Sequence, residues 1–195
     1  MISILTKDID NKKYEPLKQN ATVLAFGDSL TYGTGANENE SYPSYLARLS
    51  GLTVINAGIP GEVSKQGLNR LDKLLVKHKP KLLILCHGGN DILMRRSHKI
   101  LKENIRGMIN LALQKDIDVL LVGVADFNIF GFSTLELYAE LAEELGVMYE
   151  DDIISKIVAD SSLKSDQIHP NAKGYALMAD TFFEILKENS LIKIP

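Results

Sequence analysis

The sequence has one cysteine, no tryptophan, little net charge and no long hydrophobic run, and these shortages exclude several classes of protein. Cys86 is the only cysteine among 195 residues, so no disulfide can form within the chain. A formal net charge of -3 gives no general attraction to nucleic acid or to an anionic membrane. No stretch reaches the roughly 18 apolar residues that a spanning helix needs. We therefore expect no nucleic acid and no stable membrane anchor among the partners, and the oligomeric state stays open.

The first twenty residues lack the apolar core of a signal peptide, because Ile4 and Leu5 are followed at once by charged residues. Pro16 argues against a continuous helix in this segment. We expect residues 1–20 to form a surface arm and residues 21–195 to form a single domain, a length that suits one core. The default compartment is then the cytoplasm, and a periplasmic or secreted protein would require that a leader had been removed.

Short apolar runs alternate with longer amphipathic segments along the rest of the chain. Near-continuous apolar runs are typical of parallel strands that helices cover on both faces. The strands are predicted at 23–26, 53–56, 82–86, 119–124 and 147–149, and helices at 42–49, 68–75, 100–113, 135–145 and 175–186. Right-handed βαβ connections then give an α/β fold, a flavodoxin-like three-layer α/β/α sandwich with a five-stranded parallel sheet of order 2-1-3-4-5.

Gly27-Asp28-Ser29-Leu30 follows the first of these apolar runs. A strand that ends in Gly-Asp-Ser delivers a hydroxyl to the carboxyl edge of the sheet, where open α/β folds bind their ligands. Ser29 could serve there only as a helix N-cap, since serine is a good capping residue. Gly27 and Gly33 favour a functional interpretation, because they permit close approach of backbone beside the hydroxyl.

A nucleophilic serine needs a base, and Asp166-Gln167-Ile168-His169-Pro170 supplies a carboxylate and an imidazole on one short segment. Because Pro170 disfavours helical backbone at His169, we expect a loop in which Asp166 can hold the far nitrogen of the ring. Gly88-Gly89-Asn90-Asp91 follows the third strand. This is good turn sequence by itself, and the amide of Asn90 could also donate to an oxyanion.

Four segments in this order, namely 27–30, 56–64, 88–91 and 166–170, resemble the four blocks of the SGNH hydrolases, also called GDSL esterases and lipases. The resemblance spans residues 23 to about 183. Within the family, the chain resembles the small bacterial thioesterase, lysophospholipase and arylesterase branch. Close relatives often carry Gly-Asp-Thr-Ser where this chain has Gly61-Glu62-Val63-Ser64, and Cys86-His87 before the Gly-Gly pair is less usual than an apolar or acidic residue. Both departures concern the hydrogen bonding around the site and leave every catalytic group in place.

The resemblance implies that Ser29 is the nucleophile, that His169 is the general base and then the acid, and that Asp166 orients the imidazolium. It implies an oxyanion hole made by the backbone N–H of Ser29, the N–H of Gly61 and the side-chain amide of Asn90. The expected reaction is hydrolysis of a small ester or thioester of short-acyl, aryl or lysophospholipid type through an acyl-enzyme on Ser29. This mechanism requires no metal and no cofactor.

The resemblance places the acyl pocket beside the loops after the third and fourth strands, at 92–98 and 126–134. Apolar side chains in these loops suit an acyl or aryl group better than a sugar. The candidate substrate-binding residues are Leu93, Met94, Phe127, Ile129, Phe130 and Phe132.

Three alternatives remain open at this point. A carbohydrate O-acetylesterase would keep hydrolysis and change the substrate. Asp28, Asp91 and Asp166 at the carboxyl edge of the sheet could instead hold Mg²⁺ for phosphate chemistry. A binding module without catalysis would use Ser29 as a capping residue and nothing more.

Overall fold

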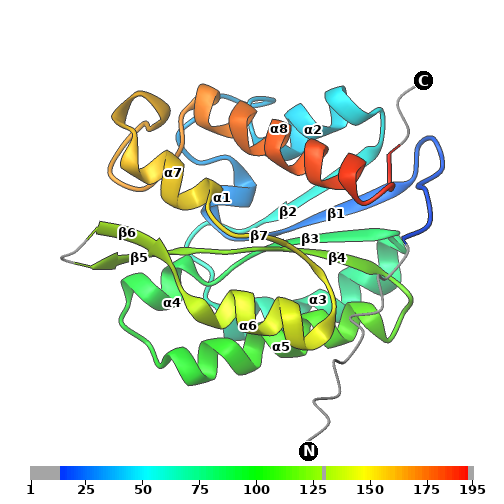
Figure 1. Ribbon diagram of the computed structural model, residues 1–195, viewed down its shortest axis with the longest axis horizontal. Helices are drawn as coiled ribbons and strands as arrows, with labels where there is room; N and C mark the ends of the chain where they lie inside the picture. The colour runs from blue at the N-terminus through cyan, green and yellow to red at the C-terminus, as the bar shows by residue number, and fades with distance from the viewer. Residues whose placement is uncertain (1–13, 129–130, 193–195) are drawn as a thin grey trace, which may run out of the picture.

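A parallel sheet of five strands forms the middle layer of the fold (Figure 1). The computed structural model describes residues 14–128 and 131–192. The strand order is β2-β1-β3-β4-β7, which confirms the predicted order because β7 is the fifth strand of this sheet. The strands are β1 (Thr22–Gly27), β2 (Thr53–Gly58), β3 (Leu82–Cys86), β4 (Asp118–Val122) and β7 (Met148–Glu150).

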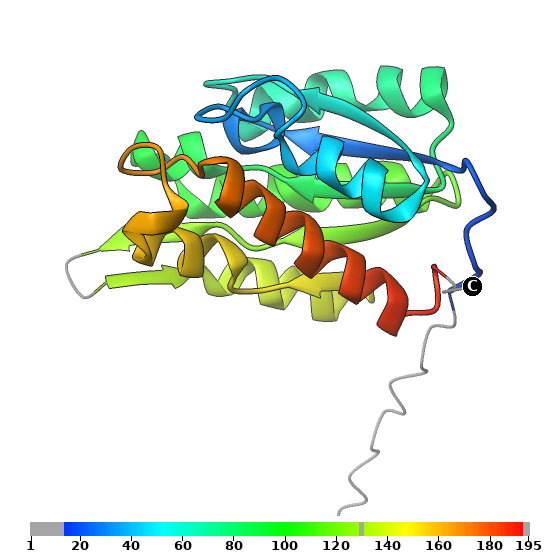
Figure 2. The ribbon, with the colours of Figure 1, turned by 90° about the horizontal axis from the view of Figure 1, so that it is seen from above.

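Helices cover both faces of the sheet, as Figures 1 and 2 show. One face carries α2 (Tyr42–Ser50), α7 (Ile153–Ala159) and α8 (Ala172–Glu188), and the other carries α3 (Ser64–His78), α4 (Gly89–Leu93), α5 (His98–Leu113) and α6 (Glu136–Leu145). In β1, Val23 and Ala25 belong to the first of two buried apolar clusters, whereas Leu24 and Phe26 belong to the second. Successive strand residues point to opposite faces, so a strand between two helical layers must be apolar throughout.

Several short elements differ from the sequence-based expectation. Residues 126–134 were expected as a loop, and they lie instead in an antiparallel hairpin of β5 (Ala125–Asn128) and β6 (Gly131–Thr134). The predicted fourth strand ends at Val122 rather than at Val124. Two helices, α4 and α7, were not predicted, and both are short, with 5 and 7 residues.

Part of the predicted N-terminal arm lies against the domain. Tyr14 is 9% exposed, and the N–H of Leu17 donates to the carbonyl of Leu191 at 2.8 Å. Within residues 14–128 and 131–192, the structure has no helix that is both long and apolar enough to cross a membrane.

Candidate active site

Ser29 lies at the carboxyl end of β1, as the first residue of the short helix α1 (Ser29–Tyr32). The N-cap of this helix is Asp28, whose Oδ1 accepts a hydrogen bond from the N–H of Leu30 at 3.2 Å. The backbone can pass close to β3 here because residue 27 is glycine, and a Cβ at Gly27 would overlap the carbonyl of Cys86. Ser29 is therefore not the capping residue, and its hydroxyl has another environment.

The Ser29 hydroxyl lies beside His169, which belongs to the loop before α8. The Nε2 of His169 lies 3.1 Å from the Oγ of Ser29, and its Nδ1 lies 2.7 Å from Oδ2 of Asp166. Oδ1 of Asp166 accepts the N–H groups of Ile168 and His169, both at 2.8 Å, so the carboxylate fixes the loop as well as the ring. The structure thus brings the three predicted residues into one continuous chain of hydrogen bonds.

The charge on Asp166 decides how His169 is protonated. Burial raises the pKa of this carboxyl, but the hydrogen bonds from His169 and from the backbone outweigh it and hold the pKa at about 2. An ionised carboxylate can only accept hydrogen bonds, so Nδ1 of His169 must carry a proton. In the neutral ring, Nε2 is then free to accept the proton of the Ser29 hydroxyl.

Asn90 and Gly61 come from two neighbouring segments at the same edge of the sheet. Asn90 is the second residue of α4, and its Nδ2 donates to the carbonyl of Glu62 at 3.0 Å and lies 3.4 Å from Oδ2 of Asp28. Gly61 has a φ of 78°, a left-handed conformation that glycine adopts without strain. Sequence reasoning had placed Asn90 after the third strand, and the structure adds that a short helix carries it.

A buried hydrogen-bond network that sequence analysis missed ties α4 to the start of α3. The carboxylate of Asp91 accepts the backbone N–H of Ser64 at 2.7 Å and its hydroxyl at 2.8 Å, and Asn104 donates to the same hydroxyl at 2.9 Å. Asp91 and Ser64 are both buried. Nothing in the sequence pairs these residues, since they belong to three different helices or turns.

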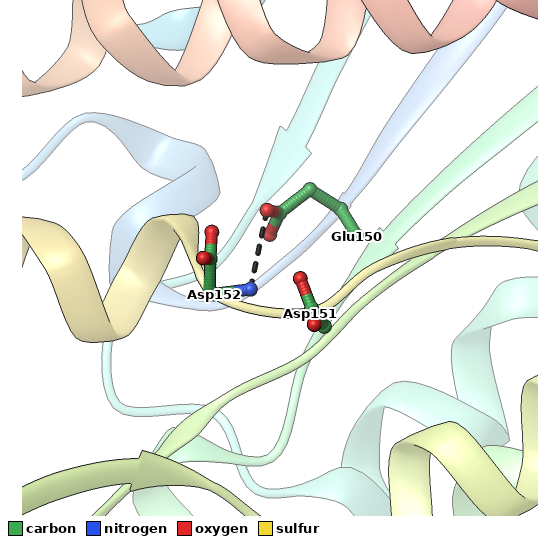
Figure 3. Close-up of side chains that lie close together, drawn as sticks. All are labelled: Glu150, Asp151 and Asp152. Atoms are coloured by element: carbon green, nitrogen blue, oxygen red, sulfur yellow. Dashed lines mark hydrogen bonds between the residues drawn. The ribbon is translucent and has the colours of Figure 1, made fainter.

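The alternative of a metal site on Asp28, Asp91 and Asp166 is wrong for this structure. Across the described part of the chain, the only set of three metal-ligating side chains that come within 4.8 Å of one another is Glu150, Asp151 and Asp152, shown in Figure 3. In that set the Glu150 carboxylate already accepts the N–H groups of Asp152 and Ile153.

A small apolar cavity of about 30 Å³ opens beside Ser29. Of the predicted substrate-binding residues, Leu93 lines this cavity and Met94 does not. Ile129 and Phe130 lie outside the described residues, and of Phe127 and Phe132 only the backbone is described. The apolar side chains that line the cavity and were not predicted are Leu30, Val124, Ala125, Ile154, Val158 and Ile168. Two of them belong to α7, and the spacing of Ile153, Ile154, Ile157 and Val158 is the signal that could have revealed this helix.

The geometry is that of a serine hydrolase built on an α/β sandwich. The chain belongs to the GDSL-like lipase/acylhydrolase family, whose model matches residues 25–177. It is 27% identical over 166 residues to thioesterase 1/protease 1/lysophospholipase L1 of Escherichia coli strain K12, which covers 82% of this chain and 80% of that protein. It is also 27% identical to an arylesterase of Vibrio mimicus over 81% of this chain and 84% of that protein.

A solved structure shares the fold. The psychrotrophic esterase EstA from Pseudoalteromonas sp., in a structure inhibited by monoethylphosphonate, superposes with a TM-score of 0.76 at 25% identity. The match covers 86% of this chain and 97% of that one.

Proposed function

We propose that this protein hydrolyses small carboxylic esters or thioesters through an acyl-enzyme on Ser29. The observation that carries this proposal is the unbroken chain of contacts from Asp166 through His169 to the Ser29 hydroxyl, at 2.7 and 3.1 Å. Such a chain activates a hydroxyl that is a weak nucleophile at its ordinary pKa. His169 takes the proton as Ser29 attacks the carbonyl carbon, and it returns the proton to the leaving group.

In the second half of the reaction, His169 takes a proton from water, the water oxygen attacks the acyl carbon, and Ser29 recovers its hydroxyl as the acid departs. Negative charge on the carbonyl oxygen is held by the N–H of Ser29, the N–H of Gly61 and the amide of Asn90. Donors of this kind accelerate the reaction because they are already oriented where the charge develops. Asp166 stays ionised and stabilises the imidazolium, as its pKa of about 2 requires.

The cavity beside Ser29 supports a short acyl group. Its volume of about 30 Å³ is small, and apolar side chains dominate its lining. Ile154 and Val158 of α7 form part of this lining, so α7 sets the length of acyl chain that fits. The named relatives act on esters and thioesters, which supports the same class of substrate.

The test is hydrolysis of p-nitrophenyl acetate in EDTA by the wild type and by Ser29→Ala, with fluorophosphonate labelling followed by intact mass. The wild type is expected to turn over and to gain one adduct. Ser29→Ala should lose labelling and about 10⁶ in kcat, as removal of a nucleophile does in serine hydrolases. Folded wild type that neither hydrolyses the ester nor gains the adduct would overturn the proposal.

Acyl-chain length is tested with acetate, butyrate and octanoate esters. Val158→Ala is expected to raise kcat/KM for butyrate relative to acetate, because it enlarges the cavity at its apolar wall. Leu177→Ala, a change on the outer side of α8 at a residue that is 37% exposed, is the control. Faster hydrolysis of an acetylated oligosaccharide than of p-nitrophenyl acetate would instead favour the carbohydrate O-acetylesterase.

A further inference from the structure

Beneath the candidate oxyanion hole lies a group of three charged or polar side chains, Glu62, Arg70 and His87, called here the Glu62 cluster. Arg70 donates from Nε to both carboxylate oxygens of Glu62, at 2.7 and 2.9 Å, and from Nη2 to Oε2 at 2.6 Å. His87 Nε2 lies 3.1 Å from the same Oε2. The His87 side chain is fully buried and that of Glu62 is only 6% exposed, whereas the Arg70 side chain is 22% exposed.

Arg70 also fixes the strand ends that carry the site. Its Nη2 donates to the carbonyl of Ala57 at 2.9 Å and to that of Gly27 at 3.3 Å, at the ends of β2 and β1. The guanidinium lies 4.0 Å from the centre of the Phe26 ring. Arg70 therefore joins the strand that leads to Ser29 with the strand that leads to Gly61.

His87 is held at one nitrogen only. A carboxylate can only accept hydrogen bonds, so Nε2 carries a proton and donates a hydrogen bond to Glu62. Nδ1 is buried and has no hydrogen-bond partner within the described residues, which leaves the contact with Glu62 as the polar anchor of the ring. The ring packs against Gly67 of α3 and 5.8 Å from the Phe26 ring, so its position is tightly limited.

The backbone of Glu62 connects this cluster to the oxyanion hole. Its carbonyl accepts the amide of Asn90 at 3.0 Å, and the residue directly before it is Gly61. We propose that Glu62, held by Arg70 and His87, is a positioning residue that fixes the Asn90 amide and the Gly61 N–H where the oxyanion forms. This inference rests on the proposed ester hydrolysis, and it assigns a role to Glu62 and His87, two of the residues at which the chain departs from the family pattern.

The variant that tests it is Glu62→Gln, which keeps the shape of the side chain and removes the charge that Arg70 and His87 bind. We expect kcat for p-nitrophenyl acetate to fall by about 10-fold to 100-fold, because loss of a whole oxyanion donor costs about 10² to 10³ and displacement costs less. KM should change by less than about threefold, since the hole acts on the transition state. Glu143→Gln, an exposed change on α6, and Ile109→Val, a buried change outside the cluster, are the matched controls for charge and for stability.

A double-mutant cycle separates positioning from general structural damage. If Glu62 acts through the oxyanion hole, Glu62→Gln should lower kcat by a smaller factor in an Asn90→Ala background than in the wild type. The two factors should differ by at least about threefold. Equal factors in both backgrounds, or a kcat of Glu62→Gln within about twofold of the wild type, would overturn the proposal.

Arg70→Lys gives a second route if Glu62→Gln does not fold. Arg70→Lys keeps the positive charge but loses the bidentate contact with Glu62, so we expect a smaller loss of kcat than for Glu62→Gln. This loss should also be smaller in the Asn90→Ala background. Labelling of the wild type by fluorophosphonate is measured in the same series. An active, labelled wild type with unaffected Glu62 and Arg70 variants would reject the positioning role alone, whereas an unlabelled wild type would reject the proposed function itself.

Discussion

The Glu62 cluster and the turn from β7 to α7 (residues 150–153) each bury a glutamate at the carboxyl edge of the sheet. The pKa values of the two carboxyl groups are shifted in opposite directions. Glu62 is 7% exposed and Glu150 is 4% exposed. The pKa of Glu62 lies below its ordinary value, whereas the pKa of Glu150 is raised to about 7. Burial alone therefore does not decide the charge of these two carboxyl groups.

The hydrogen-bond donors and charges around each carboxyl group decide the direction of its pKa shift. Burial raises both pKa values, but His87 and Arg70 donate to Glu62 and outweigh that effect. Among the described residues, Glu150 receives hydrogen bonds only from the backbone of Asp152 and Ile153, and the negative charges of Asp152 and Asp151 oppose its ionisation (Figure 3). Backbone donors at the start of a helix of 7 residues do not replace a cationic side chain here.

The largest expected effect comes from Arg70→Met, which removes the cation and leaves the Glu62 carboxylate buried. Breaking an ion pair in which the carboxylate is buried costs about 3 kcal/mol, so the free energy of unfolding should fall by about this much. The measurement is urea denaturation at pH 7, with the exposed Lys73→Met on the same helix as the control. A loss no larger than that of the control would mean that the Arg70 contact adds little.

The second prediction concerns the pH dependence of stability through Glu150. Its folded pKa of about 7 lies above the ordinary value of 4.5, so the folded state binds the proton more tightly. The stability that this proton contributes is fully present below about pH 4.5 and is lost as the pH rises through about 7, with a total of about 3 kcal/mol.

Glu150→Gln should remove this slope, which is measured as the free energy of unfolding between pH 4.5 and 8. The exposed Glu143→Gln is the control and should follow the wild type. If Glu150→Gln also follows the wild type throughout, Glu150 ionises at its ordinary pH and the contrast with Glu62 disappears.

The contrast also shows which parts of this protein could be predicted from its sequence. The strands of the sheet and the approach of Asp166 to His169 depend on neighbours within a few residues, and local patterns predicted both. The Glu62 cluster depends on residues 62, 70 and 87 in three different segments, and Arg70 has the pattern of an ordinary surface residue on an amphipathic helix. Only the tertiary fold brings these charges together, so no local pattern could reveal them.

The third prediction concerns a substitution that displaces His87, one partner of Glu62, and leaves the charges of Glu62 and Arg70 in place. A Cβ at Gly67 would overlap Nε2 of His87, so Gly67→Ala must move the ring. Overpacking costs about 1–3 kcal/mol, and the better helix propensity of alanine returns up to about 1, so a net loss of about 1 kcal/mol is expected.

Gly107→Ala is the matched control for Gly67→Ala. A Cβ at Gly107 would meet only flexible Leu68 methyls at 3.1 and 3.3 Å, and this helical glycine should therefore gain stability or stay neutral. Thermal unfolding of the two alanine variants gives the comparison directly. Equal melting temperatures would show that His87 can move at no cost.

The smallest effect is expected from Asp151→Asn, which removes one negative charge beside Glu150. The oxygen atoms of Glu150, Asp151 and Asp152 lie within 4.8 Å of one another, and Asp151 is exposed. In water a like-charge pair at such a distance repels by about 1 kcal/mol, which corresponds to less than about one pH unit. The pKa of Glu150 should fall by no more than this, measured as the midpoint of the pH dependence of stability. A larger fall would mean that the negative charges of its neighbours, more than its burial, hold Glu150 protonated, and the two glutamates would then differ mainly in the charges around them.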